Sequence, residues 1–300
     1  MREIPGLRLA SNDFLQRFLL ERAGVRGVLV RLENTWRDVR SRADYPPALA
    51  SLLGEALAAS ALLTGNIKFD GRLSVQLRST GALRLLYTEC TDEGHLRGLA
   101  RWNEETDAPL VPAADALLAI TIEQAARDLR QQGLVSLEGS DLATAFERYF
   151  AQSEQLASRI VLAEHAGRCA GLMLQPMASA GGIGAGDADG WNRVGHLLAT
   201  VTVAELTQLA PETLLTRLFH EENVRVFEPR ALSFACTCSR QRVDATLRAL
   251  GESECNEAID ENGYVDVTCE FCNQRYRLDR VDIAGLFAAS APLSAPRTAQ

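Results

Sequence analysis

Apolar residues between Val25 and Met177 follow the two-residue period of β-strands in several short runs. Val28, Val30 and Leu32 alternate with residues that we expect to face outward. Three further runs predict neighbouring strands that are joined by hairpins, with a turn at residues 79–82; these runs are residues 75–77, 83–87 and 95–99.

Two longer segments of the same region follow the period of an α-helix. The first begins at Pro46 or Pro47, where a missing N–H is harmless, and repeats apolar residues as far as Leu63. The second begins after Ser140 and Asp141 and carries three aromatic residues on one face, Phe146, Tyr149 and Phe150. Strands grouped between helices, with hairpins rather than regular β-α-β alternation, predict an α+β fold whose N-terminal domain contains a hairpin-rich sheet.

A glycine-rich stretch at residues 178–190 interrupts these patterns. Its glycines do not fit the fingerprint of a dinucleotide-binding loop, because Asp187 and Asp189 stand where that pattern requires glycine. We therefore interpret the stretch as a flexible linker.

Short amphipathic helices are predicted after the linker. Residues 194–201 carry apolar side chains at i, i+3, i+4 and i+7, Thr202 and Glu205 form a capping box, and Pro211 opens a third helix. The helices either pack permanently on the N-terminal domain or form a cover that can detach, and periodicity does not distinguish these two hypotheses.

These patterns divide the chain into four parts. We expect an N-terminal α+β domain at residues 1–178, the linker with its amphipathic helices at 179–230, a small C-terminal domain at 231–290 and a disordered tail at 291–300.

The composition is that of an ordinary soluble globular protein, with 47% hydrophobic and 23% charged residues in a chain of 300. The net charge of −8 argues against nucleic-acid binding, which requires clustered positive charge. The N-terminus lacks the apolar core of a signal peptide, and no later segment approaches the roughly 18 uncharged apolar residues of a membrane span. We expect a cytoplasmic protein that binds neither nucleic acid nor membranes.

Four of the seven cysteines form two close pairs near the C-terminus, Cys236 with Cys238 and Cys269 with Cys272, with 30 residues between the pairs. Two short chelates can supply four thiolates to one tetrahedral Zn²⁺, at Zn–S distances of about 2.3 Å. Buried cysteines without a metal have no reason to pair at such spacings. The same positions can also form disulfides when oxidised, so the spacing is compatible with a stable site or a redox switch.

The remaining cysteines fit other roles. Cys255 lies among acidic residues, which raise a thiol pKa and discourage reactivity, so we interpret it as a bystander. Cys90 and Cys169 fall in strand-like segments and are expected in the core. The C-terminal region has few large apolar residues, and a domain with so thin a core commonly depends on its metal for folding.

One pattern in the sequence is compatible with an enzymatic function. His220 and Glu222 fit the His-x-Glu pattern of zinc deaminases. However, Thr268 stands where that motif has proline before Cys269, and the first cysteine pair is left without a role. We therefore predict that the protein is not an enzyme. A constitutive zinc-ribbon interaction module is a further alternative.

Several further motifs accompany the cysteine pairs: Cys236-Thr-Cys238-Ser-Arg, the 30-residue spacer, residues 261–272 with Cys269-Glu-Phe-Cys272, Tyr276, and residues 149–155, 171–177 and 218–222. These motifs, in the same order along the chain, resemble the heat-shock protein 33 family of redox-regulated bacterial chaperones, and the likeness covers nearly the whole sequence. The main departures are Cys255 and the glycines at residues 181–190.

The resemblance implies a reduced, inactive form that holds one Zn²⁺ per chain on Cys236, Cys238, Cys269 and Cys272. It implies that oxidation under unfolding stress forms the disulfides Cys236–Cys238 and Cys269–Cys272, releases zinc and unfolds the C-terminal part. The exposed surface then holds non-native client proteins without ATP.

The resemblance also implies a homodimer in the oxidised, active form, which hands its clients to the seventy-kilodalton heat-shock chaperone system. In this interpretation the amphipathic segment from Trp191 to Phe219 is the cover, and it stays in place only while the zinc domain is folded.

Overall fold

A computed structural model describes residues 12–67, 70–105, 110–124, 129–139, 141–177, 187 and 189–288. The chain forms two compact units, residues 1–235 and 236–300. Most of the predicted glycine-rich linker and the whole predicted tail at 291–300 lie outside the described residues. The division of the chain into four parts stays a prediction.

The first unit contains two antiparallel-rich sheets. Sheet A has the order β10-β1-β2-β9-β8, and β11 also pairs with β1. Its strands are β1 (Phe14–Leu20), β2 (Val25–Leu32), β8 (Arg159–His165), β9 (Arg168–Pro176), β10 (Val224–Val226) and β11 (Arg230–Ala231).

Sheet B has the order β12-β5-β4-β3-β6-β7. Its strands are β3 (Gly71–Arg78), β4 (Leu83–Thr91), β5 (His95–Trp102), β6 (Leu117–Gln124), β7 (Leu129–Ser136) and β12 (Ser233–Phe234). The three predicted neighbouring strands are confirmed as β3, β4 and β5, which pair antiparallel in that order. β12 pairs in parallel with β5, whereas the other described strand pairs are antiparallel.

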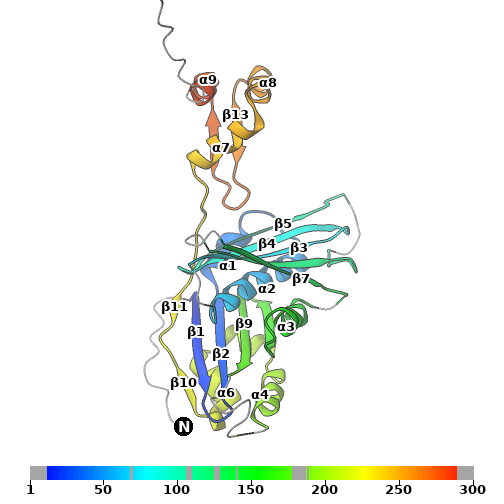
Figure 1. Cartoon of the computed structure of the whole chain (residues 1–300), viewed down its shortest axis with the longest axis vertical. Coiled ribbons are helices and arrows are strands. Elements are labelled where there is room, and N and C mark those ends of the chain that lie inside the picture. The colour runs from blue at the N-terminus through cyan, green and yellow to red at the C-terminus, as the bar shows by residue number, and fades with distance from the viewer. Residues whose placement is uncertain are drawn as a thin grey trace, which may run out of the picture. The chain divides into compact units, whose positions relative to one another are not determined.

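Helix α2 (Pro47–Thr64) lies between the two sheets (Figure 1). It contacts strands of both sheets, and most of its side chains are buried in the main core of the unit. By length and composition α2 would pass as a membrane span, which corrects the expectation that no segment approaches one. Because 72% of it is buried inside the fold, α2 is accounted for as the core helix.

Two other helices contact α2, namely α1 (Asn34–Arg40) and α3 (Leu142–Ser153). The predicted start of α3 is confirmed, because the Asp141 carboxylate accepts a 2.7 Å hydrogen bond from the backbone N–H of Thr144. The aromatic face of α3 is buried as the helical period predicts.

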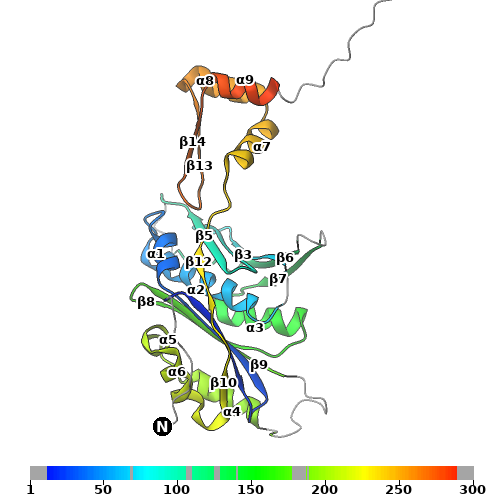
Figure 2. The same cartoon turned by 90° about the vertical axis from the view of Figure 1, so that its left-hand side faces the viewer.

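Three short helices pack on the face of sheet A that points away from α2 (Figure 2). They are α4 (Gly190–Ala199), α5 (Val203–Gln208) and α6 (Pro211–Phe219), followed by the 3-10 turn η2 (His220–Glu222). We call α4, α5 and α6 the cover helices. Their apolar stripes are buried, and the capping box of Thr202 and Glu205 is present.

The cover helices change the environment of β2. The sequence pattern predicts outward-facing residues between Val28, Val30 and Leu32, but Leu29 is fully buried and Arg31 is only 6% exposed. That expectation is wrong because both faces of sheet A are covered, one by α2 and the other by the cover helices.

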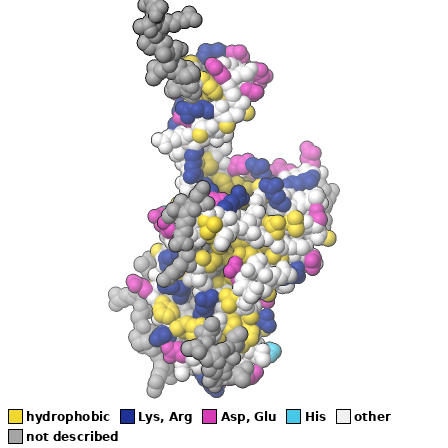
Figure 3. All heavy atoms as spheres, in the orientation of Figure 1, with side chains coloured by type: hydrophobic (Ala, Val, Ile, Leu, Met, Phe, Trp, Pro, Cys, Tyr) yellow, Lys and Arg dark blue, Asp and Glu magenta, His cyan; other side chains and the backbone are white. Residues whose placement is uncertain are grey.

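The outer surface of sheet B is more open. Leu117 on β6 and Leu134 on β7 are 50% and 61% exposed. Over the face of the first unit drawn in Figure 3, hydrophobic side chains reach the surface between charged side chains of both signs.

The second unit is small. A hairpin of β13 (Val265–Thr268) and β14 (Arg275–Leu278) is accompanied by α7 (Arg240–Leu250), α8 (Glu252–Asn262) and α9 (Arg280–Ala288). Its core is built mainly from medium-sized aliphatic residues such as Leu247, Ile259 and Leu278.

Candidate functional site

The four paired cysteines converge in the second unit. Their sulfur atoms all lie within 4.8 Å of one another. Cys236 Sγ lies 3.6 Å from Cys269 Sγ, and Cys238 Sγ lies 3.4 Å from Cys272 Sγ, so the shortest contacts link one pair to the other. All four cysteines are free thiols of intermediate burial.

This arrangement fits a tetrahedral metal ion. Four sulfurs at about 2.3 Å from a central Zn²⁺ are about 3.8 Å from one another. The observed separations lie close to that value. An all-thiolate donor set selects thiophilic metals such as zinc. The four residues can therefore hold one metal ion.

Local backbone structure positions each pair. Cys236 and Cys238 directly precede Ser239, whose hydroxyl caps α7 by accepting from the N–H of Arg242. Cys269 and Cys272 lie in the turn between β13 and β14. There the N–H of Cys269 donates to the carbonyl of Gln274 at 2.9 Å, and the N–H of Asn273 donates to the carbonyl of Cys269 at 2.8 Å.

The Tyr276 hydroxyl, on β14, donates a 3.2 Å hydrogen bond to Cys238 Sγ. Burial acts to raise the pKa of Cys238, but the hydrogen bonds from Tyr276 and the other thiols outweigh it and lower the pKa to about 7. Burial and the neighbouring thiols raise the pKa of Cys272 to about 12. Cys238 is therefore the first of the two to ionise.

The other three cysteines lie away from this cluster. Cys255 is 1% exposed in the core of the second unit, and burial followed by the charge of Glu254 raises its pKa. Cys90 and Cys169 are fully buried in the first unit, as predicted, and burial raises the pKa of Cys90 to about 11. These thiols are packing residues.

Glu222, the proton-shuttling residue of the deaminase hypothesis, is engaged elsewhere. Its side chain is 1% exposed, and both carboxylate oxygens accept hydrogen bonds from Arg193 of α4, at 2.7 and 2.9 Å. Arg193 also pairs with Asp187 at 2.6 Å. Glu222 thus ties η2 to the first cover helix, and the enzymatic alternative is not favoured.

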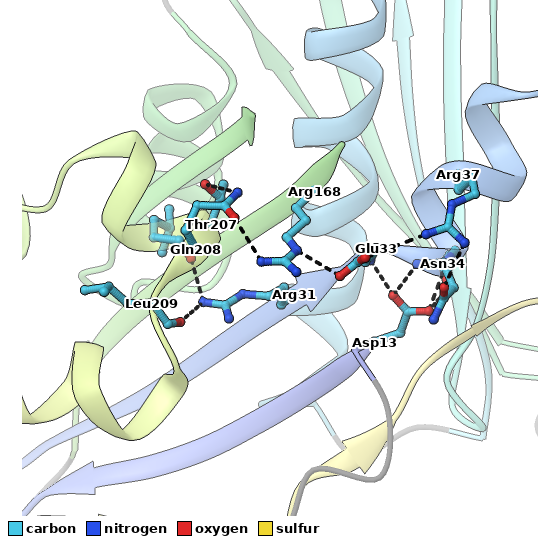
Figure 4. Close-up of polar contacts among 11 residues, drawn as sticks. Asp13, Arg31, Glu33, Asn34, Arg37, Arg168, Thr207, Gln208 and Leu209 are labelled. Carbon is cyan, nitrogen blue, oxygen red and sulfur yellow. Dashed lines mark hydrogen bonds and ion pairs between the residues drawn. The ribbon is translucent and has the colours of Figure 1, made fainter. Parts of the chain in front are cut away.

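A second set of polar contacts joins the cover helices to sheet A (Figure 4). Arg31 of β2 donates to the carbonyl of Leu206 at 3.0 Å and to the carbonyl of Leu209 at 2.5 Å. Burial, followed by the nearby Arg168, lowers the pKa of Arg31 to about 10. Arg31 therefore satisfies two carbonyls at the C-terminal end of α5.

Arg168 extends this contact. It donates to the Glu33 carboxylate at 2.8 Å and to the Gln208 side chain at 2.9 Å (Figure 4). Near Glu33, the buried Asp13 carboxylate accepts hydrogen bonds from the first N–H groups of α1, including that of Asn34 at 3.0 Å. The contact thus extends from α5 across sheet A to α1.

Sequence reasoning did not identify Arg31, Arg168 or Arg193 as functional residues. Hydrophobic periodicity carries no information about which carbonyl or carboxylate a single arginine reaches. One signal was available, because Arg31 interrupts an otherwise apolar stretch of β2, and a charged residue in such a strand requires partners.

Comparisons with known proteins agree with these features. The model of a protein family described as "Hsp33 protein" matches residues 13–279 of this chain. The 33 kDa chaperonin of Nitrosococcus oceani is 43% identical over 293 residues, covering 96% of this chain and 99% of the relative. That of Chromobacterium violaceum is 41% identical over 285 residues, covering 94% and 96%.

A solved structure shares the fold. The 33 kDa chaperonin (heat shock protein 33 homolog) of Thermotoga maritima superposes with a TM-score of 0.80 at 20% identity, covering 93% of this chain and 99% of the other. Together with the sequence matches over nearly the whole chain, this shows that the protein belongs to the Hsp33 family.

Proposed function

We propose that this chain is a redox-regulated, ATP-independent holdase chaperone. Its relatives are named chaperonins, and its four clustered thiols supply a reactive site of the kind that such regulation requires. In the reduced form Cys236, Cys238, Cys269 and Cys272 hold one Zn²⁺. The bound ion would link the segment ahead of α7 to the β13–β14 turn and so stabilise a unit with a small core.

Oxidation removes this link. A peroxide accepts two electrons and two protons for each disulfide that forms, Cys236 with Cys238 and Cys269 with Cys272, and is itself reduced to water. The disulfides no longer offer thiolate ligands, so zinc is not retained. Without its metal the second unit loses much of its stability and unfolds.

Release of the cover helices follows in this proposal. They bury an apolar face of sheet A that includes Phe14, Phe18 and Leu172. They are attached to it by the short apolar stripe of each helix and by a few polar contacts. Once exposed, that face offers a surface that binds non-native chains with little sequence selectivity.

The observation that carries the proposal is the burial of both faces of sheet A, where, among the described residues, short helices cover the outer face. The test is light scattering of a denatured client protein that aggregates on dilution. The chain treated with peroxide at raised temperature should suppress the aggregation, and the reduced zinc form should not. Equal activity of the two forms would contradict the proposal.

The same proposal includes a cytoplasmic location, a homodimer in the oxidised state and transfer of clients to the seventy-kilodalton heat-shock chaperone system. It includes no catalytic activity and no binding to nucleic acid or membranes. A constitutive zinc-ribbon module would instead keep its metal and its fold in peroxide.

A further inference from the structure

Residues 224–234 form an extended segment that we call the strap. Its first part contains β10 and β11, which pair with β1, and its last part contains β12, which pairs with β5. The N–H of Leu232 donates to the carbonyl of Asp13 at 3.1 Å, and the N–H of Ser233 donates to that of Gly94 at 3.1 Å. The strap thus occupies an edge of both sheets, and two residues later the chain reaches Cys236.

The strap is an imperfect partner for β1. Leu15 lies opposite Arg230 and Phe18 lies opposite Val226, so three strap residues, 227–229, face two residues of β1. This is a β-bulge that interrupts the ladder. Pro229 lies within it and has no N–H to donate. A strand without the bulge would pair with β1 continuously.

A buried polar group lies where the ladder is interrupted. Gln16 of β1 is fully buried, and its Nε2 donates to the carbonyl of Phe227. Its Oε1 has no hydrogen-bond partner among the described residues. A buried acceptor without a donor is costly, so the strap fits β1 poorly at this position.

Apolar packing is weak in the part of the strap that pairs with β1, although Leu232, in its last part, is buried in the main core. Phe227 is 40% exposed, Arg225 is exposed and Val226 is only half-buried. Polar side chains add to the ladder: Arg230 donates to the Thr64 hydroxyl at 2.6 Å and to the carbonyl of Asp92 at 3.2 Å, and Arg225 pairs with Glu21 at 3.1 Å. Residues 224–231 of the strap can therefore be exchanged for another extended chain without exposing the main core, whereas Leu232 leaves that core if the whole strap is released.

We propose that the outer edge of β1 is a binding site for an extended segment of a non-native polypeptide, which the strap occupies in the resting protein. The inference rests on the proposed function, because the strap is released only when the second unit unfolds. The incoming segment adds to sheet A as an antiparallel strand and is recognised mainly through its backbone. It requires several consecutive residues without proline.

The test uses a fluorescent 11-residue peptide with the strap sequence, residues 224–234, and the full-length protein in both redox states. In an antiparallel ladder, N–H groups point alternately toward and away from the partner strand. The N–H of Phe227 donates to the carbonyl of Arg17 at 3.0 Å, so that of Val226 points away from β1. One peptide is N-methylated at Phe227, and its matched control is N-methylated at Val226.

The peptide should bind the oxidised protein and not the reduced protein, and it should displace a bound client. Methylation at Phe227 should weaken binding at least about tenfold, and methylation at Val226 should change it by less than about twofold. A peptide that lacks Glu228 and carries Pro229→Val should bind more tightly than the strap sequence.

The outcomes separate the two proposals. If the oxidised protein holds a client but binds no strap peptide, or binds both methylated peptides equally, the edge site is wrong and the holdase function stands. If the oxidised protein holds no client, the holdase function fails, and the edge site fails with it.

Discussion

The guanidinium of Arg31, in the middle of sheet A, donates a 3.0 Å hydrogen bond to the backbone carbonyl of Leu206 in cover helix α5. Arg31 is 6% exposed, so water is largely excluded from this contact. A charged donor that crosses from the sheet to the cover fixes the position of α5, which apolar stripes alone would leave less specific.

Replacement of Arg31 should therefore loosen the cover in the reduced protein. Arg31→Ala leaves the carbonyls of Leu206 and Leu209 without their donor, at a cost of about 1.5–3 kcal/mol. Amide hydrogen exchange in α5 should become faster, and binding of a hydrophobic dye should rise. Arg37→Ala, at a side chain that is 66% exposed, should change neither. Equal exchange in all three proteins would contradict the role of Arg31.

The ion pair between Arg193 and Glu222 should stabilise the cover in the same way. Glu222→Gln removes the charge from a side chain that is 1% exposed and should lower the free energy of unfolding of the first unit by about 2 kcal/mol. Arg193→Gln should have a similar effect. Because both changes remove the same interaction, the double variant should lose less free energy of unfolding than the sum of the losses of the two single variants.

Urea unfolding followed by tryptophan fluorescence measures this effect, since all three tryptophans of the chain lie in the first unit. Strict additivity of the two single changes would show that the pair makes no energetic contribution.

Glu55 on core helix α2 should make stability depend on pH. Burial, followed by the charges of Asp141 and Glu164, raises its pKa from an ordinary 4.5 to about 7. The native protein therefore binds this proton more tightly than the unfolded chain does. The free energy of unfolding falls as pH rises from the unfolded pKa through the folded pKa, and the loss is complete about one pH unit above the folded pKa.

Between pH 6 and pH 8 this single group should reduce the free energy of unfolding by about 1 kcal/mol. Glu55→Gln should lose less stability than the parent over that interval, as measured by the same urea unfolding. An identical pH dependence of parent and variant would show that Glu55 ionises normally.

Cys255 should not take part in metal binding. Cys255→Ala removes a sulfur that is 1% exposed and should destabilise the second unit by about 1 kcal/mol while leaving one zinc per chain. Cys269→Ser should abolish stable zinc binding. Zinc quantified after purification distinguishes the two variants, and loss of zinc from Cys255→Ala would contradict the assignment.

Tyr276→Phe should weaken the metal site. The variant loses the 3.2 Å hydrogen bond to Cys238 Sγ, so a competing chelator should remove zinc several times faster. Tyr264→Phe is the matched control, because the Tyr264 ring lies 3.9 Å from the Arg277 guanidinium and a phenylalanine ring keeps that contact. Equal release rates would assign no role to the hydroxyl.

Local patterns predicted much of the fold and the composition of the site. The helical period and proline position gave α2, Asp141 gave the start of α3, and the capping box gave α5. The spacing of the cysteines predicted a cluster that the structure brings together. Each of these features depends on residues close in sequence, or on a chemical requirement that only a few residue types meet.

Long-range contacts were not predictable in this way. The pairing of β1 with residues 224–231 joins segments some 200 residues apart, and no pattern in either segment specifies the other. The burial of Leu29 and the partners of Arg31 depend on the cover helices, whose place on sheet A is a tertiary property.

The central claim is that thiol oxidation, metal loss and release of the cover are coupled. The most direct measurement follows zinc with a chromogenic chelator during peroxide treatment at raised temperature, with amide exchange of the cover helices and suppression of client aggregation measured on the same samples. The account predicts release of about one zinc per chain, with faster exchange in α4 to α6 and the onset of holdase activity in step. Zinc release with the cover still protected, or activity while zinc is fully retained, would contradict it.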